Sequence, residues 1–182
     1  MRAEPTDLPE VLVLRGESYA DDRGSLRESF NRRDFAAATG NEVEFVQDNL
    51  SHSRRGVLRG VHYQVAPYAQ GKLVTVVHGA VWDVAVDLRR SSPRFRKWVG
   101  VELVAEEPRQ LWVPPGFGHG FLTLSDTADV LYKITSYHQP EAERSLRWDD
   151  PEVGIEWPLE GPPILSAKDA AATGLRESEL FA

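Results

Sequence analysis

The 182-residue sequence contains no cysteine, which excludes disulfides, thiolate metal ligands and a thiol nucleophile. It also lacks a run of roughly twenty apolar residues that could cross a bilayer, and residues 1–5 lack the apolar run of a signal peptide. Basic residues are scarce, with 21 Lys and Arg against 28 Asp and Glu and a formal charge of −7. We therefore expect a cytoplasmic protein that binds neither nucleic acid nor membrane, and whose phosphate recognition, if any, is local.

The length of 182 residues fits one domain with a core large enough to need no disulfide or structural zinc. No internal repeat, low-complexity tract or linker divides the chain. We expect a single domain over residues 1–182, with an N-terminal arm at 1–20 and a polar C-terminal tail at 170–182 that is partly disordered.

Hydrophobic residues alternate with period two between Gly79 and Arg89, which is typical of a strand. Frequent Gly and Pro residues, 14 and 12 of them, separate similar short runs and leave little room for long helices. Helical signals occur only at 32–39, closed by Gly40, and just after Ser166. The pattern predicts an all-β sandwich or barrel. The other predicted strands are 11–14, 43–47, 57–64, 73–78, 98–103, 110–113, 120–124 and 130–137.

Polar side chains crowd residues 45–64, a stretch that should supply core strands. Burying so many amides and charges without partners would be costly. One interpretation is that they line a barrel interior and bind a polar ligand, and the other is an exposed polar strand edge. We favour the first for the group as a whole. The residues expected to point inward are Gln47, Asn49, Arg59, His62 and Gln64.

The segment from Pro114 to His119 matches the P-x-G-x-x-H pattern of the second cupin motif, in which a turn delivers a histidine into a small β-barrel. This resemblance implies a cupin-type double-stranded β-helix, or jelly roll, with a few short helices. Metal-binding cupins add an H-x-H motif followed by Glu. Here the corresponding residues are His62, Tyr63 and Gln64, with no Glu before Lys72, so we expect no metal.

A longer set of motifs, in order over roughly 21–169, resembles the dTDP-4-dehydrorhamnose 3,5-epimerase family. The matching elements are Asp22-Arg-Gly24 with Glu28, Gln47-Asp-Asn-x-Ser-x-Ser, Gly56-Val-Leu-Arg-Gly-Val-His62-Tyr-Gln64, Gln70-Gly-Lys-Leu73, Asp83-Val-Ala-Val-Asp-Leu-Arg89, Ser91-Ser-Pro93, Pro114-Pro-Gly-Phe-Gly-His-Gly-Phe121, Tyr132-Lys-Ile-Thr135, Trp148-Asp-Asp-Pro151, Gly154-Ile-Glu-Trp-Pro158 and Leu165-Ser-Ala-Lys-Asp169.

The resemblance implies an isomerase of deoxysugar-nucleotide biosynthesis acting on a dTDP-4-keto-6-deoxyhexose. The C4 carbonyl acidifies the hydrogens on C3 and C5, so each centre can invert by deprotonation to an enolate and reprotonation on the opposite face. Such a reaction needs a base, an acid and donors near the enolate oxygen. It needs no cofactor.

The resemblance also implies roles for four catalytic residues. His62 would be the base, because an unperturbed pKa near 6.5 suits proton removal near neutral pH, and Asp169 would orient it. Locally, however, Ser166 to Asp169 also fits a capping box. Tyr132 would be the acid, although a single tyrosine in a strand is often a half-buried residue with a purely structural role. Lys72 would face the enolate oxygen, with His119 assisting there or at the phosphates, although a lysine at position 72 could equally extend to the surface.

The resemblance implies a nucleotide site as well. Recognition of a diphosphate needs side chains that donate bidentate hydrogen bonds or carry a point charge. The sequence also departs from the family pattern at two places that would affect how the sugar is held. His138 replaces a usual tyrosine that stacks on thymine, and Ser25-Leu26 replaces aromatic residues after Arg23-Gly24. The implied contacts are Arg23, Arg59, Lys72 and His119 for the phosphates, Glu28, Gln47 and Asn49 for the nucleotide or sugar, His138 for the base, and Glu143 and Lys168 at further binding positions.

The resemblance further implies a homodimer in which the region around Arg23 reaches the partner's pocket. Three alternatives stay open from sequence. They are an epimerase that inverts only C3 or only C5 in an antibiotic-sugar pathway, a metal-dependent cupin enzyme that uses His62 and His119, and a catalytically silent sugar-nucleotide binding protein.

Overall fold

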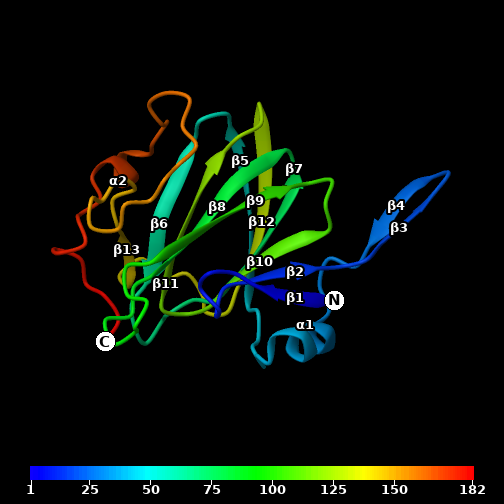
Figure 1. Ribbon diagram of the computed structural model, residues 1–182, viewed down its shortest axis with the longest axis horizontal. Coiled ribbons are helices and arrows are strands. Elements are labelled where there is room, and N and C mark those ends of the chain that lie inside the picture. Colours follow the sequence, from blue (N-terminus) through cyan, green and yellow to red (C-terminus); the bar gives the residue numbers. More distant parts are fainter.

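Two antiparallel β-sheets form the body of the molecule in a computed structural model that describes residues 1–182 (Figure 1). In spatial order, the six-stranded sheet consists of β1 (Arg2–Pro5), β2 (Leu12–Arg15), β10 (Arg109–Val113), β7 (Lys72–His78), β12 (Thr127–Ile134) and β5 (Gln47–Arg54). The five-stranded sheet consists of β13 (Glu143–Ser145), β6 (Leu58–Gln64), β11 (Phe117–Thr123), β8 (Ala80–Asp87) and β9 (Trp98–Val104). The predicted all-β fold is confirmed.

The main core lies between the two sheets. Val74 and Val130 of the six-stranded sheet pack with Ala85 and Phe121 of the five-stranded sheet, and all four are buried. Burying such side chains supplies roughly 1.5–3 kcal/mol each for the larger ones. The inner faces of the two sheets therefore hold the fold together and define the space in which inward-pointing polar residues lie.

A second core covers the outer face of the five-stranded sheet. Val61 and Val84 on that face contact the C-terminal region, whose Leu175 and Phe181 pack against them. The backbone N–H of Arg90 also donates to the carbonyl of Phe181 at 2.9 Å. The partial disorder expected after residue 170 is therefore not observed, because apolar residues spaced along this polar tail attach it to the sheet.

The two helices are short and lie where the sequence predicts them. α1 (Arg32–Thr39) starts at Asn31, whose side chain accepts from the N–H of Asp34, and ends at Gly40 with φ of 70°. α2 (Ala167–Ala170) follows Ser166 as its N-cap. Neither helix has the length and apolar character that crossing a membrane would need.

The strand predictions are confirmed for most of the core but wrong at 43–47, where the strand begins only at Gln47 and runs to Arg54 as β5. Its side chains alternate between partly buried and exposed, with polar residues on both faces, so no hydrophobic period marked it. The N-terminal region was also expected to be an arm, whereas β1 and β2 in it pair with each other and with β10.

A separate hairpin of β3 (Ser18–Asp21) and β4 (Gly24–Arg27) projects away from the sheets (Figure 1). All of its residues except Arg27 are exposed, including the large apolar side chains of Tyr19 and Leu26. Exposed apolar residues on a projecting element are typical of a contact surface for another chain.

Candidate active site

Two histidines lie opposite each other on neighbouring strands of the five-stranded sheet. His62 of β6 is the register partner of His119 of β11. The register then shifts, so that Phe121 pairs with Arg59. This β-bulge places Arg59 on the same inner face as His62, which simple alternation would not do for residues three apart.

Gly60 makes this bulge possible. Its φ is 127°, a region that L side chains rarely adopt, and a Cβ there would lie 2.5 Å from the Cα of Gly120 and 2.9 Å from the carbonyl oxygen of His119. Only glycine allows the two histidine strands to approach this closely.

His62 is held by a carboxylate from the C-terminal region. Its Nε2 lies 2.5 Å from Oδ1 of Asp169, the first-turn acid of α2. Ser166 accepts from the backbone N–H of Asp169 at 3.1 Å and donates its hydroxyl to Oδ2 of the same residue at 2.8 Å. Ser166 thus caps α2 and Asp169 orients His62, so the cap and the orienting carboxylate coexist, although the carboxylate accepts from the Ser166 hydroxyl and not from its backbone N–H as in a capping box. Because Nε2 faces the carboxylate, Nδ1 of His62 remains as the proton acceptor.

The electrostatics of this pair favour a neutral imidazole beside an ionised carboxylate. Burial lowers the pKa of His62, and its hydrogen bond to Asp169 acts in the opposite direction, while Lys72 and Lys168 lower it further. Burial acts to raise the pKa of Asp169, but the hydrogen bonds from His62 and Ser166 outweigh it and leave that pKa below its usual value. A neutral His62 is the form that can take a proton.

His119 has its own carboxylate partner, which the sequence reasoning missed. Its Nε2 lies 2.8 Å from Oδ1 of Asp83, which is fully buried on β8. Asp83 sits in the regular Asp-Val-Ala-Val-Asp run of β8, and its register partner on β11 is Phe121, on the same face as His119. Two signals were available, namely its phase within that strand and its place at the start of the motif from Asp83 to Arg89.

Lys72 comes from the opposite sheet and reaches across the interior. Its side chain is buried, and Nζ donates to the backbone carbonyl of His62 at 3.2 Å. Burial lowers the pKa of Lys72 to about 8, against the attraction of Asp83 and Glu143. The alternative of a surface lysine is wrong, and the amine lies beside both histidine strands.

Tyr132 also lies on the inner face of the six-stranded sheet, where it packs against the main core. It is the register partner of Asn49 on β5 and of Val74 on β7. Burial raises the pKa of Tyr132, with Arg59 opposing and Glu143 adding to the shift. The phenol and the imidazole of His62 therefore project from opposite sheets toward the same interior.

Arg59 is oriented by β5. Its Nε donates to the hydroxyl of the buried Ser53 at 3.0 Å, and Nη2 donates to the carbonyl of His52 at 3.2 Å. These bonds leave Nη1 of the guanidinium unused. Ser53 was not predicted as a site residue, although it ends the Gln47-Asp-Asn-x-Ser-x-Ser motif.

The remaining predicted binding residues form a connected rim. Lys168 lies 2.6 Å from Oε1 of Glu143, and Nε2 of His138 lies 3.4 Å from its Oε2. Gln47 donates to Asn49 at 2.8 Å and accepts from the backbone N–H of His138 at 3.2 Å. The pKa of Glu143 is low, because the contacts with Lys168, His138 and His62 outweigh the effect of burial.

Gln64 lies in the interior, as predicted, but its amide is fully engaged with backbone. It donates to the carbonyls of Tyr68 and Tyr137 at 2.8 and 3.2 Å and accepts from the N–H of Gln139 at 2.7 Å. Gln64 therefore fixes the segment that carries His138 instead of facing a ligand.

Two predicted residues are not brought to this site within one chain. Arg23 sits at the tip of the projecting hairpin, where its exposed side chain pairs with Asp21. Glu28 is exposed after β4 and accepts from Asn31 at 3.2 Å. Neither residue contacts the interior of its own chain.

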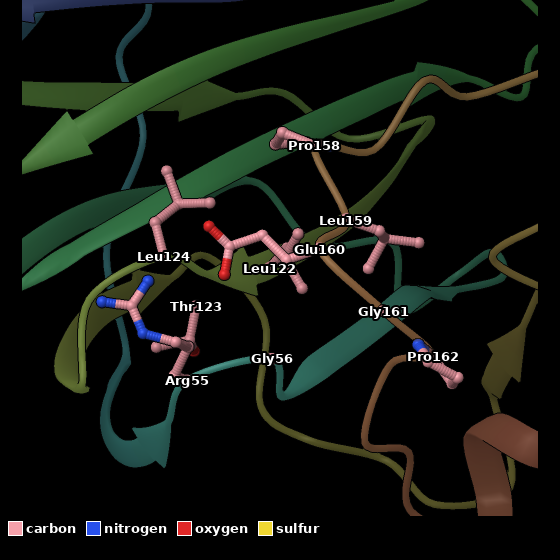
Figure 2. Close-up of a pocket in the computed structure, with 10 residues that line it drawn as sticks. All are labelled: Arg55, Gly56, Leu122, Thr123, Leu124, Pro158, Leu159, Glu160, Gly161 and Pro162. Atoms are coloured by element: carbon pink, nitrogen blue, oxygen red, sulfur yellow. The ribbon is translucent and has the colours of Figure 1, made fainter.

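A cavity of about 240 Å³ lies elsewhere, between the turn at Arg55 and Gly56, the end of β11 and the loop 158–162 (Figure 2). None of the predicted site residues lines it. The candidate site is instead the place between the sheets where four side chains converge, namely those of His62, His119, Lys72 and Tyr132.

Comparisons with known proteins identify relatives over nearly the whole chain. The family model described as dTDP-4-dehydrorhamnose 3,5-epimerase matches residues 5–177. The dTDP-4-dehydrorhamnose 3,5-epimerase of Shigella flexneri is 50% identical over 181 residues, which cover 100% of this chain and 99% of the relative.

Two solved structures have the same fold, a cupin-type jelly roll. The dTDP-6-deoxy-D-glucose-3,5-epimerase RmlC of Legionella pneumophila, in complex with dTDP-4-keto-L-rhamnose, matches with a TM-score of 0.96 and 46% identity over 99% of this chain and 97% of that one. ChmJ, a 3'-monoepimerase of Streptomyces bikiniensis in complex with dTDP-quinovose, matches with a TM-score of 0.89 and 35% identity over 97% and 88%. With its fold, its paired histidines and these relatives, the chain belongs to the dTDP-4-dehydrorhamnose 3,5-epimerase family.

Proposed function

We propose that this protein inverts C3 and C5 of a dTDP-4-keto-6-deoxyhexose, with His62 as the base and Tyr132 as the acid. The observation that carries the proposal is the 2.5 Å contact between His62 and Asp169 on one side of an interior that Tyr132 enters from the other sheet. An acid and a base on opposite faces of a hexose are what inversion through a planar enolate needs.

The first step transfers the C3 or C5 proton to Nδ1 of His62, and the electron pair of the broken C–H bond moves into the enolate. Asp169 stabilises the resulting imidazolium through Nε2. The negative charge develops on the C4 oxygen, and the Lys72 ammonium and His119 are the donors placed to stabilise it.

The second step returns a proton from the Tyr132 hydroxyl to the opposite face of the same carbon. A tyrosinate remains and is reprotonated from solvent, while His62 loses its proton to solvent. A raised pKa keeps Tyr132 protonated until the basic enolate forms. The cycle consumes no cofactor, because each proton removed is replaced.

The nucleotide would be bound by the remaining polar groups. Arg59, with one guanidinium nitrogen unused, suits the diphosphate, and Gln47 and Asn49 suit the nucleoside or sugar. Glu143 and Lys168, which pair with each other, would lie at further binding positions. His138 at the rim offers an imidazole face to thymine, with less stacking area than a tyrosine.

A homodimer would complete the site. The projecting hairpin carries Arg23 at its tip and exposed Tyr19 and Leu26 on its strands, so it is suited to insertion into a second copy. Arg23 and Glu28 would then reach the partner's nucleotide. We place the protein, as one domain, in the cytoplasm, where sugar nucleotides are made and used.

Inversion at both carbons is favoured over inversion at one, because the relatives that are 50% identical over the whole chain are named 3,5-epimerases. The test is incubation with dTDP-4-keto-6-deoxyglucose in heavy water, followed by proton NMR. Loss of both the C3 and C5 proton signals is expected. Loss of one would identify a monoepimerase, and tight binding without any loss would identify a silent binding protein and overturn the proposal.

A further inference from the structure

Asp150 is a buried carboxylate in the motif Trp148-Asp-Asp-Pro151 that the reaction leaves without a role. Only 4% of the residue is exposed. Its Oδ1 accepts from the backbone N–H groups of Glu152 at 2.9 Å and Val153 at 3.3 Å, and its Oδ2 accepts from that of Leu175 at 2.8 Å. All of its hydrogen-bond partners are backbone groups, so Asp150 joins two stretches of chain.

One of these stretches is the segment 164–175, which carries Asp169 and is called the Asp169 segment below. On its N-terminal side, Ile164 exchanges two backbone hydrogen bonds with β6 and the turn before it, at 3.0 and 2.8 Å. On its C-terminal side, the N–H of Arg147 donates to the carbonyl of Thr173 at 2.9 Å, and the N–H of Leu175 donates to Asp150.

Between these attachments lies α2, a helix of four residues. A single helical turn is not stable by itself, because the conformational entropy lost in forming the first turn exceeds the stabilisation from its few hydrogen bonds. The place of Asp169 against His62 therefore depends on how both ends of the Asp169 segment are fastened.

A carboxylate is the only common side chain that can make both connections of Asp150. It offers an acceptor oxygen to each side, one to the loop at 152–153 and one to Leu175. An asparagine of the same shape has one oxygen and one NH₂ group, so one backbone N–H would face a second donor. Leaving a buried N–H unpaired in this way is unfavourable.

We propose that Asp150 is a positioning residue for catalysis, which fixes the C-terminal end of the Asp169 segment and thereby sets the contact between Asp169 and His62. This inference rests on the proposed roles of those two residues. Asp150 touches neither of them and acts only through the backbone from Leu175 to α2.

The test compares Asp150→Asn with Asp149→Asn, since the neighbouring Asp149 pairs only with the exposed Arg147. We expect Asp150→Asn to lower kcat by about 10- to 100-fold, the cost of a small displacement of a catalytic group. Asp149→Asn should retain wild-type activity. The low-field proton NMR signal of the His62 N–H that faces Asp169 should be present in the wild type and Asp149→Asn and lost or shifted upfield in Asp150→Asn.

A second comparison separates positioning from a general loss of structure. On an Asp169→Asn background, Asp150→Asn should lower kcat no further, because the contact it supports is already removed. The same factor on both backgrounds, or an unchanged low-field signal, would overturn the proposal.

Gly174→Ala probes the same connection if Asp150→Asn fails to fold. A Cβ on Gly174 would lie 3.2 Å from Oδ2 of Asp150, so it should disturb the bond to Leu175 and lower kcat in the same direction. If Gly174→Ala disturbs the bond to Leu175 but keeps the wild-type kcat, the inference is contradicted.

The proposed function has its own test, because it would be contradicted if Asp169→Asn alone left kcat unchanged.

Discussion

The two histidines of the site have carboxylate partners of different origin. His119 and Asp83 both lie on adjacent strands of one sheet, and the side chain of His119 is 7% exposed. His62 meets Asp169 from a short helix 107 residues away, and its side chain is 27% exposed.

This difference matches two kinds of chemical work. A histidine that donates a fixed hydrogen bond benefits from a rigid, dry setting, because preorganised donors need no rearrangement during reaction. A histidine that gains and loses a proton needs access to substrate and solvent and a carboxylate that can stabilise the charged form. On the proposed mechanism, the sheet supplies the first setting, for His119, and the C-terminal region supplies the second, for His62.

Removing the base should have the largest effect. His62→Ala takes away the only group proposed to accept the C3 and C5 protons, so we expect kcat to fall by about 10⁴-fold, the upper range for general base catalysis. Deuterium exchange into the substrate, followed by NMR, measures it directly. His119→Ala should retain measurable exchange, and equal losses in the two variants would erase the distinction between the histidines.

Neutralising the carboxylate partners of the two histidines, Asp169 and Asp83, should reduce kcat by different factors. Asp169→Asn removes the charge that stabilises the His62 imidazolium and should lower kcat by about 10²- to 10³-fold. Asp83→Asn should cost only about tenfold, because the strands still hold His119 in register. Steady-state kinetics of the two variants provide the measurement, and the reverse order would show that the sheet-bound pair contains the base.

The close approach of the two histidine strands can be tested through Gly60. Gly60→Ala should lower the free energy of unfolding by about 3 kcal/mol, since it combines left-handed strain with a clash against Gly120 and His119. Gly24→Ala is the matched control, because Gly24 has a φ of 126° but no atom within 4 Å of the added Cβ. Urea denaturation at equal protein concentration should show the smaller loss in the control. An equal loss of unfolding free energy in the two variants would mean that the close approach of the two histidine strands does not require a glycine at position 60.

The smallest predicted effect is on pH dependence. The neutral form of His62 is active and burial lowers its pKa below 6.5, so kcat/KM should fall on the acid side only below that pH. The Lys72 ammonium has a pKa of about 8, so a second loss should begin near pH 8 as the amine loses its proton. Asp169→Asn removes a contact that raises the pKa of His62, so its acid limb should move to lower pH. An acid limb that moves to higher pH would contradict this assignment.

The sequence predicted most core strands where a hydrophobic period carried the signal, and its motifs picked out residues that the structure brings together between the sheets, among them His62, His119 and Lys72. The alternation in residues 80–88 and the glycine closing α1 are local patterns, and the structure confirms both. The polar strand β5 was misplaced because its polar side chains line the interior and hide the usual period.

What the sequence could not predict depends on contacts between distant residues. The bulge at Gly60 decides that Arg59 and His62 share a face, and the partner of His119 is set by the pairing of β8 and β11. The tail after residue 170 looks polar in sequence, yet Leu175 and Phe181 attach it to the outer face of a sheet. None of these follows from local composition.

The central claim is that His62 and Tyr132 act on opposite faces of the same sugar carbon, and Tyr132→Phe in heavy water tests it most directly. Without the phenol, His62 can still remove the proton and return a deuteron to the same face. We predict deuterium incorporation at C3 or C5 with the original configuration retained. Incorporation with inversion in Tyr132→Phe would contradict the account, because the acid would then have to be another group.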